Sequence, residues 1–356
     1  MAGVNQQIYA TLVERGVELH VVAPRHWHHP YAPQGFDVEP IAALRGSMTL
    51  LPTLLEGRPQ RHLYRARPSA VLEAHHPAAL YLEEECFSLV AMQWALAAHR
   101  AGVPYGLQAW ENLDRPLPWV IKALRRRVLA HASFVVARTP AAQRQVEYWG
   151  ARCPIRIIGS PVPALDAIAR VPHEGFRVGF VGRLVEEKGV VGMVEASTAT
   201  GATAVLIGDG PLASRLEHRP GVELHRGVAH EAVAELLATV DVLVLWSSTT
   251  ATWAEQFGRV LVEAMGLGIP VVGSTCGEIP WVISTTGGGV VVPEGDHGAL
   301  VAALTELEES PSLRTELGER GRRSVEATFS LDAAATAMCE LFAGFGVTSG
   351  ARGFSA

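Results

Sequence analysis

Two cations and two carboxylates in the second half of the sequence could act on one anionic molecule. Arg183 and Lys188 are five residues apart after an apolar run, and they could flank a diphosphate, the arginine as a two-pronged donor and the lysine as a point charge. Glu255 and Glu263 stand on either side of Phe257, and each carboxylate could accept hydrogen bonds from neutral hydroxyls. Together these residue types suit a sugar attached to a nucleotide.

The elements predicted around these residues would bring them to one edge of a sheet. The apolar run 242–245 is typical of a buried parallel strand, and a short helix is expected from about Gly258 to Gly266. The free amides at the start of this helix would form an anion site. A second strand, 205–207, ends in a turn at Gly208 and Gly210, where backbone can approach a ligand. For each residue alone, an ordinary surface or loop position is the simpler explanation.

Three stretches resemble the signature of the family-4 retaining glycosyltransferases of the GT-B fold. They are 181–189, 208–211 and 255–265; the resemblance is specific from about Gly175 to Phe329 and looser before it. It implies an α/β architecture of two facing Rossmann-like domains, each a doubly wound parallel sheet. A nucleotide-sugar donor would be held mainly by the second domain.

The resemblance also implies roles for individual residues. Arg183 and Lys188 would bind the donor diphosphate and offset the charge of the leaving group, and Glu255 would contact the donor sugar. Glu263 would bind the ribose hydroxyls, and Val228 would lie against the base. The expected donor-binding residues are Gly3, Gly182, Gly208, Gly210, Val228, Phe257, Gly258, Arg259, Val260 and Glu263.

Composition limits the class of protein. With 356 residues, 48% hydrophobic and 19% charged, the chain predicts two globular domains. The net charge of -6 argues against nucleic acid as a general partner. Four scattered cysteines without a CxxC pair indicate reduced thiols, and neither a long apolar run nor a signal peptide is found. A cytoplasmic protein is therefore expected; the sequence does not indicate its oligomeric state.

The pattern of elements predicts the domain boundaries. We expect an acceptor domain over 1–160, a linker over 161–175, a donor domain over 176–330, a terminal helix crossing back over 331–346 and a tail over 347–356. In the donor domain, strands are expected near 177–181, 203–207, 222–225, 242–245, 269–273 and 290–293.

The start of the chain departs from the family pattern. A helix is predicted over 5–15 and a strand over 17–23, whereas a family member would begin with an apolar strand and a glycine loop before that helix. This first strand, normally central in the sheet, is apparently missing. Either the natural start lies upstream of Met1 or another segment fills the gap.

The acceptor side is expected in the first half of the sequence. Strands at 79–82 and 104–109 would deliver Glu84, Glu85, Glu111 and Asn112 to one sheet edge, although a solvated charge run explains the acids equally well. The helix 117–130 carries Lys122, Arg125, Arg126 and Arg127 and could contact an anionic membrane, but a solvated face is the commoner explanation.

Residues 24–60 are rich in proline and are expected to be irregular. Three histidines there, His26, His28 and His29, suggest a metal site. We set that interpretation aside because no helical or strand spacing aims them at one point, and the family resemblance implies no metal in the active site.

The sequence thus predicts a retaining, metal-independent glycosyltransferase without a cofactor, which moves a sugar from a nucleotide-sugar donor to a small-molecule or glycan acceptor. Alternatives are a donor-binding protein that has lost activity and a sugar-nucleotide epimerase of the same fold. A phosphorylase-like enzyme would need pyridoxal phosphate. Neither the nucleotide, the sugar nor the acceptor can be identified from these motifs.

Overall fold

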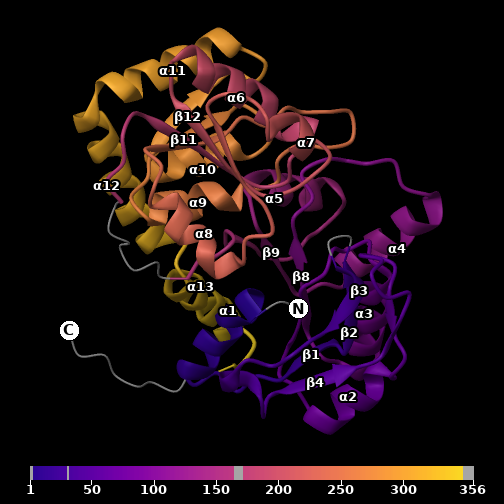
Figure 1. Ribbon diagram of the computed structural model, residues 1–356. Coiled ribbons are helices and arrows are strands. Elements are labelled where there is room, and N and C mark those ends of the chain that lie inside the picture. Colours follow the sequence, from indigo (N-terminus) through magenta and orange to yellow (C-terminus); the bar gives the residue numbers. More distant parts are fainter. Residues whose placement is uncertain (1–2, 30–31, 164–170, 348–356) are drawn as a thin grey trace. The chain divides into compact units, whose positions relative to one another are not determined.

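The chain forms two compact units in the computed structural model, which describes residues 3–29, 32–163 and 171–347 (Figure 1). Unit 1 is Met1–Pro161 together with Leu331–Ala356, and unit 2 is Val162–Ser330. Both are α/β units built on parallel strands, as predicted. Within the described residues, no helix is both long and apolar enough to cross a membrane.

Unit 2 is a doubly wound sheet of six parallel strands. The strands are β11 (Arg177–Val181), β12 (Thr203–Ile207), β13 (Val222–His225), β14 (Val242–Leu245), β15 (Val271–Ser274) and β16 (Gly289–Val292). Their order is β13-β12-β11-β14-β15-β16, so the direction of winding reverses between β11 and β14. All six predicted strands are confirmed. The four central strands are buried and read as apolar runs, whereas the edge strand β13 is half-buried and alternates apolar with polar residues.

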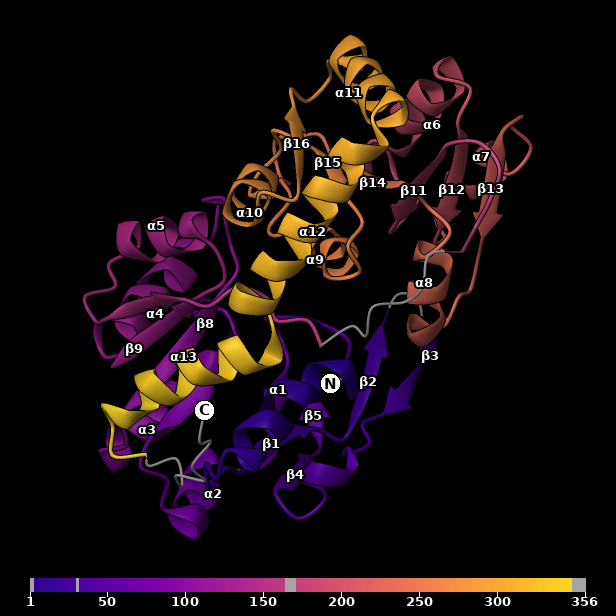
Figure 2. The same ribbon diagram turned by 90° about the vertical axis from the view of Figure 1, so that its left-hand side faces the viewer.

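Helices flank this sheet in two groups. One group contains α6 (Val190–Ala199) and α11 (His297–Glu309), and the other contains α9 (Arg259–Gly266), α10 (Ile279–Thr286) and α12 (Pro311–Thr328) (Figure 2). The short elements η2 (Glu186–Lys188), α7 (Ala213–Leu216) and α8 (His230–Leu237) complete the unit.

Unit 1 contains a four-stranded parallel sheet in the order β10-β9-β8-β7. Its strands are β7 (Leu80–Leu82), β8 (Tyr105–Ala109), β9 (Phe134–Ala137) and β10 (Ile155–Ile157). Alternate residues of β9 face opposite cores: Phe134 and Val136 belong to one, Val135 and Ala137 to the other. The predicted strand over 17–23 begins later, as β1 (Val21–Pro24), and pairs with β4 (Met48–Leu51) in a separate sheet.

Six helices cover these strands: α1 (Gly3–Glu14), α2 (Pro68–His75), α3 (Leu89–Ala101), α4 (Trp119–Ala130), α5 (Pro140–Tyr148) and α13 (Leu331–Ala343). α13 packs on α1 (Figure 1). Local sequence explains the ends of α3, since the Ser88 hydroxyl accepts the Ala91 amide and Gly102, at φ +69°, ends the helix.

The expectation that residues 24–60 are irregular is wrong. β2 (His26–His29) and β3 (Ala32–Asp37) form an antiparallel hairpin, and β5 (Thr53–Leu54) pairs with β6 (Leu63–Tyr64). A short 3-10 helix, η1 (Ala42–Leu44), lies between them. Among these four strands only β3 contains a proline, Pro33, which a short edge strand tolerates because it does not need every backbone N–H for pairing.

The basic face predicted for helix 117–130 is incomplete. Arg125 is buried, and its guanidinium lies 4.0 Å from the centre of the Trp149 ring and 3.6 Å from the Asp114 carboxylate. One of the four cations therefore belongs to the interior of unit 1, where it bridges α4 and the end of α5.

Candidate functional site

The predicted donor residues gather where the winding of the unit 2 sheet reverses. Gly182, Arg183 and Lys188 follow β11, and Glu255 follows β14, its neighbour in the sheet. In open α/β sheets, ligands bind outside the carboxyl ends of the strands at such a reversal point. The sheet order thus brings together two segments that are about seventy residues apart in the sequence.

Lys188 and Glu255 form the central ion pair of this edge. The Lys188 ammonium donates to Glu255 Oε2 over 2.5 Å, and the Ser247 hydroxyl donates to the same oxygen over 3.2 Å. Only 17% of the lysine side chain and 10% of the glutamate side chain are exposed. The ammonium also lies 5.0 Å from the centre of the Trp253 ring. The ammonium is therefore held by two neighbours, Glu255 and Trp253, and the glutamate is itself held by Ser247.

Arg183 is the more accessible cation. About half of its side chain is exposed, and the Glu187 carboxylate is 3.8 Å from its guanidinium. Such an exposed pair contributes little to stability, so the guanidinium is available to an anionic ligand.

The start of α9 offers backbone and side-chain groups to the same edge. Gly258 precedes the helix with φ +75°, and Arg259 donates to Glu263 Oε1 over 2.9 Å. The Phe257 ring is buried against Phe329 and Trp281, so this residue can offer a ligand its backbone only. Val260 lies in the first turn of the helix, where backbone amides face an anion.

The loops after β11 and β12 are tied together. The Gly182 amide donates to the Ile207 carbonyl over 3.0 Å, and the Leu184 amide donates to the Asp209 carbonyl over 2.9 Å. A Cβ atom on Gly208 would lie 1.9 Å from the Gly182 carbonyl oxygen. The glycines at 208 and 210 therefore allow the two loops to lie in direct backbone contact.

This contact makes Gly208→Ala a destabilising change. We expect a loss of about 3 kcal/mol in the free energy of unfolding, because the methyl group clashes with backbone and φ is +151°. Urea denaturation would measure it. Gly201→Ala is the matched control, since Gly201 also has positive φ but open space around its Cβ position; about 1 kcal/mol is expected there. Equal losses in the two variants would contradict this account of the loop contact.

The two remaining donor-binding candidates lie in different units. Val228 is half-buried and follows the turn at Gly227, beyond β13 in unit 2. Gly3 opens α1 in unit 1. Their contacts with a base and with phosphates remain predictions.

The predicted acceptor residues lie in unit 1, where most have partners within that unit. Glu85 is buried, and its Oε1 accepts the amides of Trp110 and Glu111 over 2.7 and 2.9 Å. Glu111 is also buried and pairs with Arg115 over 3.1 Å. These two carboxylates organise the loop after β8. Asn112 lies in the same loop, and its role as an acceptor contact is still a prediction.

Glu84 lies beside a histidine and, like Glu85, has a pKa that burial raises. Its Oε1 lies 3.5 Å from His62 Nε2, and burial is the main reason why the pKa of Glu84 is raised to about 7. Burial also lowers the pKa of His62. A carboxyl group with a pKa near neutrality can hold or release a proton at working pH, as acid and base groups of active sites do.

The raised pKa of Glu84 predicts a pH dependence of stability. A carboxyl pKa that is higher in the folded chain than the ordinary 4.5 favours folding fully below pH 4.5, and this contribution is lost as pH rises through about 7. Glu84→Gln should therefore raise Tm relative to the wild type more at pH 8 than at pH 5. Thermal denaturation at both pH values checks this, with the surface change Glu73→Gln as the control for net charge. A Tm difference independent of pH would contradict the assignment.

The reason for setting aside His26 and His28 is wrong. Both lie on strand β2 at alternate positions, so their side chains share a face, and Glu56 approaches them from the loop after β5. Because this segment was expected to be irregular, the strand spacing of the two histidines was not recognised. The side chain of His29 lies outside the described residues.

Two residues that contact the Lys188–Glu255 pair were not predicted. Ser247 and Trp253 both contact the Lys188–Glu255 pair, from the loop that follows β14. The sequence does show that both residues lie in the polar segment between an apolar strand and a helix. It does not show which groups their side chains contact, because those contacts depend on how the loop folds.

A cavity of about 510 Å³ lies elsewhere in unit 2. Its lining includes His173, Phe176, Asp241 and Arg314, at the amino ends of β11 and β14. Arg183, Lys188 and Glu255 follow the carboxyl ends of the same two strands, so the cavity lies at the opposite edge of the sheet from these residues.

Two α/β units, each built on a parallel sheet, are the architecture of the GT-B fold. Two family models match the chain: "Glycosyl transferase 4-like domain" over residues 1–160 and "Glycosyl transferases group 1" over residues 163–324. The chain belongs to this glycosyltransferase family.

Curated relatives agree with this assignment. The chain is 32% identical over 225 residues to the lipopolysaccharide core biosynthesis glycosyltransferase LpsE of Rhizobium meliloti, a match that covers 59% of this chain and 64% of that protein. It is 27% identical over 315 residues to LpsD of the same organism, covering 80% and 90% of the two chains. The chain thus spans somewhat less than two thirds of the length of LpsE and most of LpsD.

Solved structures show the same fold. The crystal structure of HepE from Anabaena in complex with UDP matches with a TM-score of 0.66 at 19% identity, covering 78% of this chain and 82% of HepE. Other structures of HepE contain UDP with glucose or UDP-glucose. At this identity, the likeness establishes the fold.

Proposed function

We propose that the chain transfers a sugar from a nucleoside-diphosphate sugar to an acceptor with retention of configuration, and that the reaction needs no metal ion. The observation that carries the proposal is the position of Arg183, Lys188 and Glu255 at the reversal point of the unit 2 sheet. Binding of UDP and UDP-glucose by HepE, which has the same fold, supports a nucleotide-sugar donor.

The charges that develop during sugar transfer explain why cations are expected at this site. As the bond between sugar and diphosphate breaks, positive charge grows on the sugar and negative charge on the leaving phosphate. Arg183, Lys188 and the amides at the start of α9 supply fixed positive charge and dipoles for that phosphate. Metal ions often provide this stabilisation in other enzymes, and here we assign it to the two cations.

The Lys188–Glu255 pair would change its partners when the donor binds. A phosphate oxygen within reach of the ammonium would share it with Glu255, whose carboxylate is held by Ser247. Glu255 could then accept a hydroxyl of the donor sugar, and Glu263 could do the same for the ribose. The acceptor hydroxyl would attack on the face from which the diphosphate leaves, with a leaving phosphate oxygen taking its proton.

The location of the reaction is a further part of the proposal. The four cysteines, Cys86, Cys153, Cys276 and Cys339, are free thiols, as is usual in a reducing compartment. We therefore place the reaction in the cytoplasm.

Calorimetric titration with UDP, GDP, ADP and dTDP, followed by hydrolysis of the matching sugar nucleotides in EDTA, tests this proposal. We expect one nucleotide to bind and its sugar conjugate to be hydrolysed slowly without a metal ion. The anomeric proton signal of the first released sugar, followed by NMR, should show retention. Binding without turnover toward any hydroxyl acceptor would identify a donor-binding protein, and interconversion of the sugar without an acceptor would identify an epimerase. Binding of none of the nucleotides would overturn the donor site itself.

A further inference from the structure

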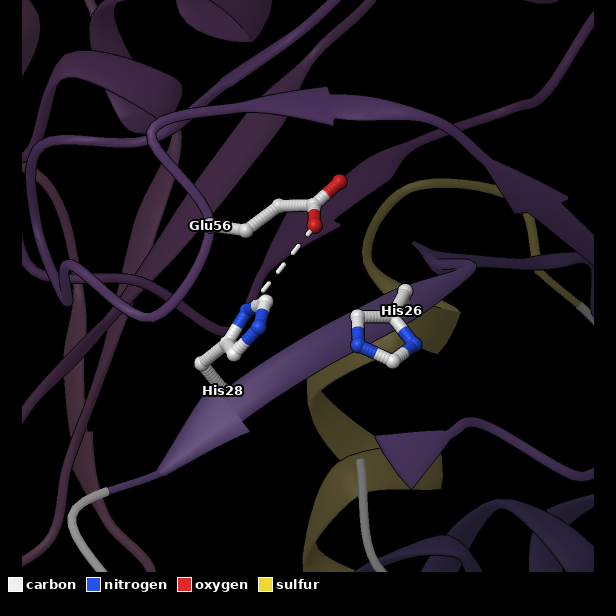
Figure 3. Close-up of side chains that lie close together, drawn as sticks. All are labelled: His26, His28 and Glu56. Atoms are coloured by element: carbon white, nitrogen blue, oxygen red, sulfur yellow. Dashed lines mark ion pairs between the residues drawn. The ribbon is translucent and has the colours of Figure 1, made fainter. Parts of the chain in front are cut away.

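Two histidines and a glutamate meet within unit 1. His26 and His28 lie on β2 and point to the same side of the strand, and Glu56 faces them from the following loop (Figure 3). One ligand atom from each residue lies within 4.8 Å of the others. We propose that these three residues bind a divalent transition-metal ion, with Zn²⁺ as the best fit.

The ligand types favour zinc. Two imidazoles and one carboxylate form a common three-residue Zn²⁺ set, which leaves one position for water. Bonds of about 2.1 Å in a tetrahedral site place neighbouring ligand atoms about 3.4 Å apart. The Nδ1 atom of His28 is now 4.0 Å from Glu56 Oε2, so the groups need to close by about an ångström. Their side chains are 33%, 45% and 30% exposed for His26, His28 and Glu56, which leaves room for that adjustment.

His26 is already oriented as a metal ligand would be. Its Nδ1 lies 2.8 Å from Asp37 Oδ1, across the hairpin, which leaves Nε2 as the ligand atom. A carboxylate on the second ring nitrogen is the usual support of a metal-binding histidine, because it fixes the tautomer and makes the ring more basic. Figure 3 shows His26 turned with its ring toward His28.

Glycines allow the chain to pass close to both histidines. A Cβ atom on Gly35 would lie 2.2 Å from His26 Nε2, and one on Gly57 would lie 2.7 Å from His28 Cβ. Both glycines have positive φ, +75° and +72°. The hairpin and the loop after β5 can therefore approach closely only with glycine at these positions.

Ordinary ion pairs are the simpler explanation for part of this arrangement. His26 with Asp37 and His28 with Glu56 could be two separate pairs on a partly exposed surface, where each would contribute little. Two separate pairs do not require the rings to adjoin, yet the ring centres of His26 and His28 are only 4.9 Å apart. A shared metal ion accounts for two imidazole rings that lie this close together.

The ion would act as a structural clip. It would join β2 to the loop at Glu56, two segments that are about 28 residues apart, and so stabilise this part of unit 1. Arg183, Lys188, Glu255 and the other donor-binding candidates except Gly3 belong to unit 2. The clip therefore shares no residue with the donor-binding candidates of the reaction proposed above.

Zn²⁺ titration of the full chain without an affinity tag tests the inference. The protein is first treated with chelator and then followed by calorimetry and by Co²⁺ absorption, which gives visible bands for a four-coordinate site. We expect binding of one equivalent, weakened at least tenfold in His26→Ala/His28→Ala and in Glu56→Gln. Asp37→Asn should weaken it about tenfold, as changes to supporting carboxylates do.

A matched control separates this site from surface histidines. His99 and His131 are another exposed pair, with ring centres 4.2 Å apart, so His99→Ala/His131→Ala removes the same side chains elsewhere. Unchanged binding in His26→Ala/His28→Ala, equal loss in the control variant, or no binding by the wild type would overturn the proposal. If the double alanine variant does not fold by circular dichroism, Glu56→Gln and Asp37→Asn, which keep the hairpin side chains, decide the question.

Chelator should also lower the Tm of the metal-loaded wild type and leave that of Glu56→Gln unchanged. This readout does not depend on enzyme activity, so a failed transferase assay and a failed metal site are distinguishable. An equal Tm with and without chelator in the wild type would contradict the clip.

Discussion

Replacing Arg183 or Lys188 by alanine should lower kcat for sugar transfer or donor hydrolysis by about 10²-fold, which corresponds to about 3 kcal/mol in the activation free energy. Both cations follow β11 at the reversal point of the sheet, where they would face the leaving diphosphate. Their loss would remove stabilisation that is strongest in the transition state, so kcat should fall more than KM rises. Steady-state kinetics with the nucleotide sugar identified by calorimetry would measure it.

Arg215→Ala is the matched control for lost positive charge. Arg215 is an exposed arginine of unit 2 that pairs with Glu186 over 3.3 Å, and its removal should leave kcat within about twofold, since exposed pairs contribute little. Near-normal turnover in Arg183→Ala, with normal folding, would exclude the proposed role of this arginine.

Breaking the Lys188–Glu255 pair should cost stability as well as activity. Glu255→Ala leaves an ammonium that is only 17% exposed without its carboxylate, and we expect a loss of about 3 kcal/mol in the free energy of unfolding. Lys188→Met should cost a similar amount, because a carboxylate at a 10% exposed position then lacks its cation. Urea denaturation at neutral pH would measure both.

The double variant completes the test of the pair. Lys188→Met/Glu255→Ala removes both charges together, so its cost should be well below the sum of the single losses, by 1 kcal/mol or more. Strict additivity of the two single losses would show that the short contact between these side chains contributes no coupling.

Unit 2 could be predicted from sequence in detail, and the reason is physical. Its four central strands, β12, β11, β14 and β15, are buried on both faces and appear as short apolar runs. The strands β11 and β12 are each followed by a glycine whose conformation the loop needs. The residues at the ends of these strands had to meet at one edge. That rule placed Arg183, Lys188 and Glu255 together without any knowledge of their contacts.

The hairpin of unit 1 could not be predicted in the same way. β2 and β3 are short, polar and interrupted by proline, so they carry no apolar alternation. Without that alternation, the sequence also did not show that His26 and His28 lie on the same face of a strand. The burial of charged groups could not be predicted from the sequence either. Arg125 is buried because Trp149, 24 residues later, packs against it, and this contact depends on the tertiary structure.

The backbone contact between the loops after β11 and β12 limits which sequence changes these loops can tolerate. Because the Gly182 and Leu184 amides bind carbonyls of the neighbouring loop, a residue inserted into or deleted from either loop would put both out of register. Variant libraries aimed at a new donor should therefore keep the lengths of both loops and vary the side chains around them. We expect insertions here to be lost from such a selection long before substitutions at the surrounding exposed positions.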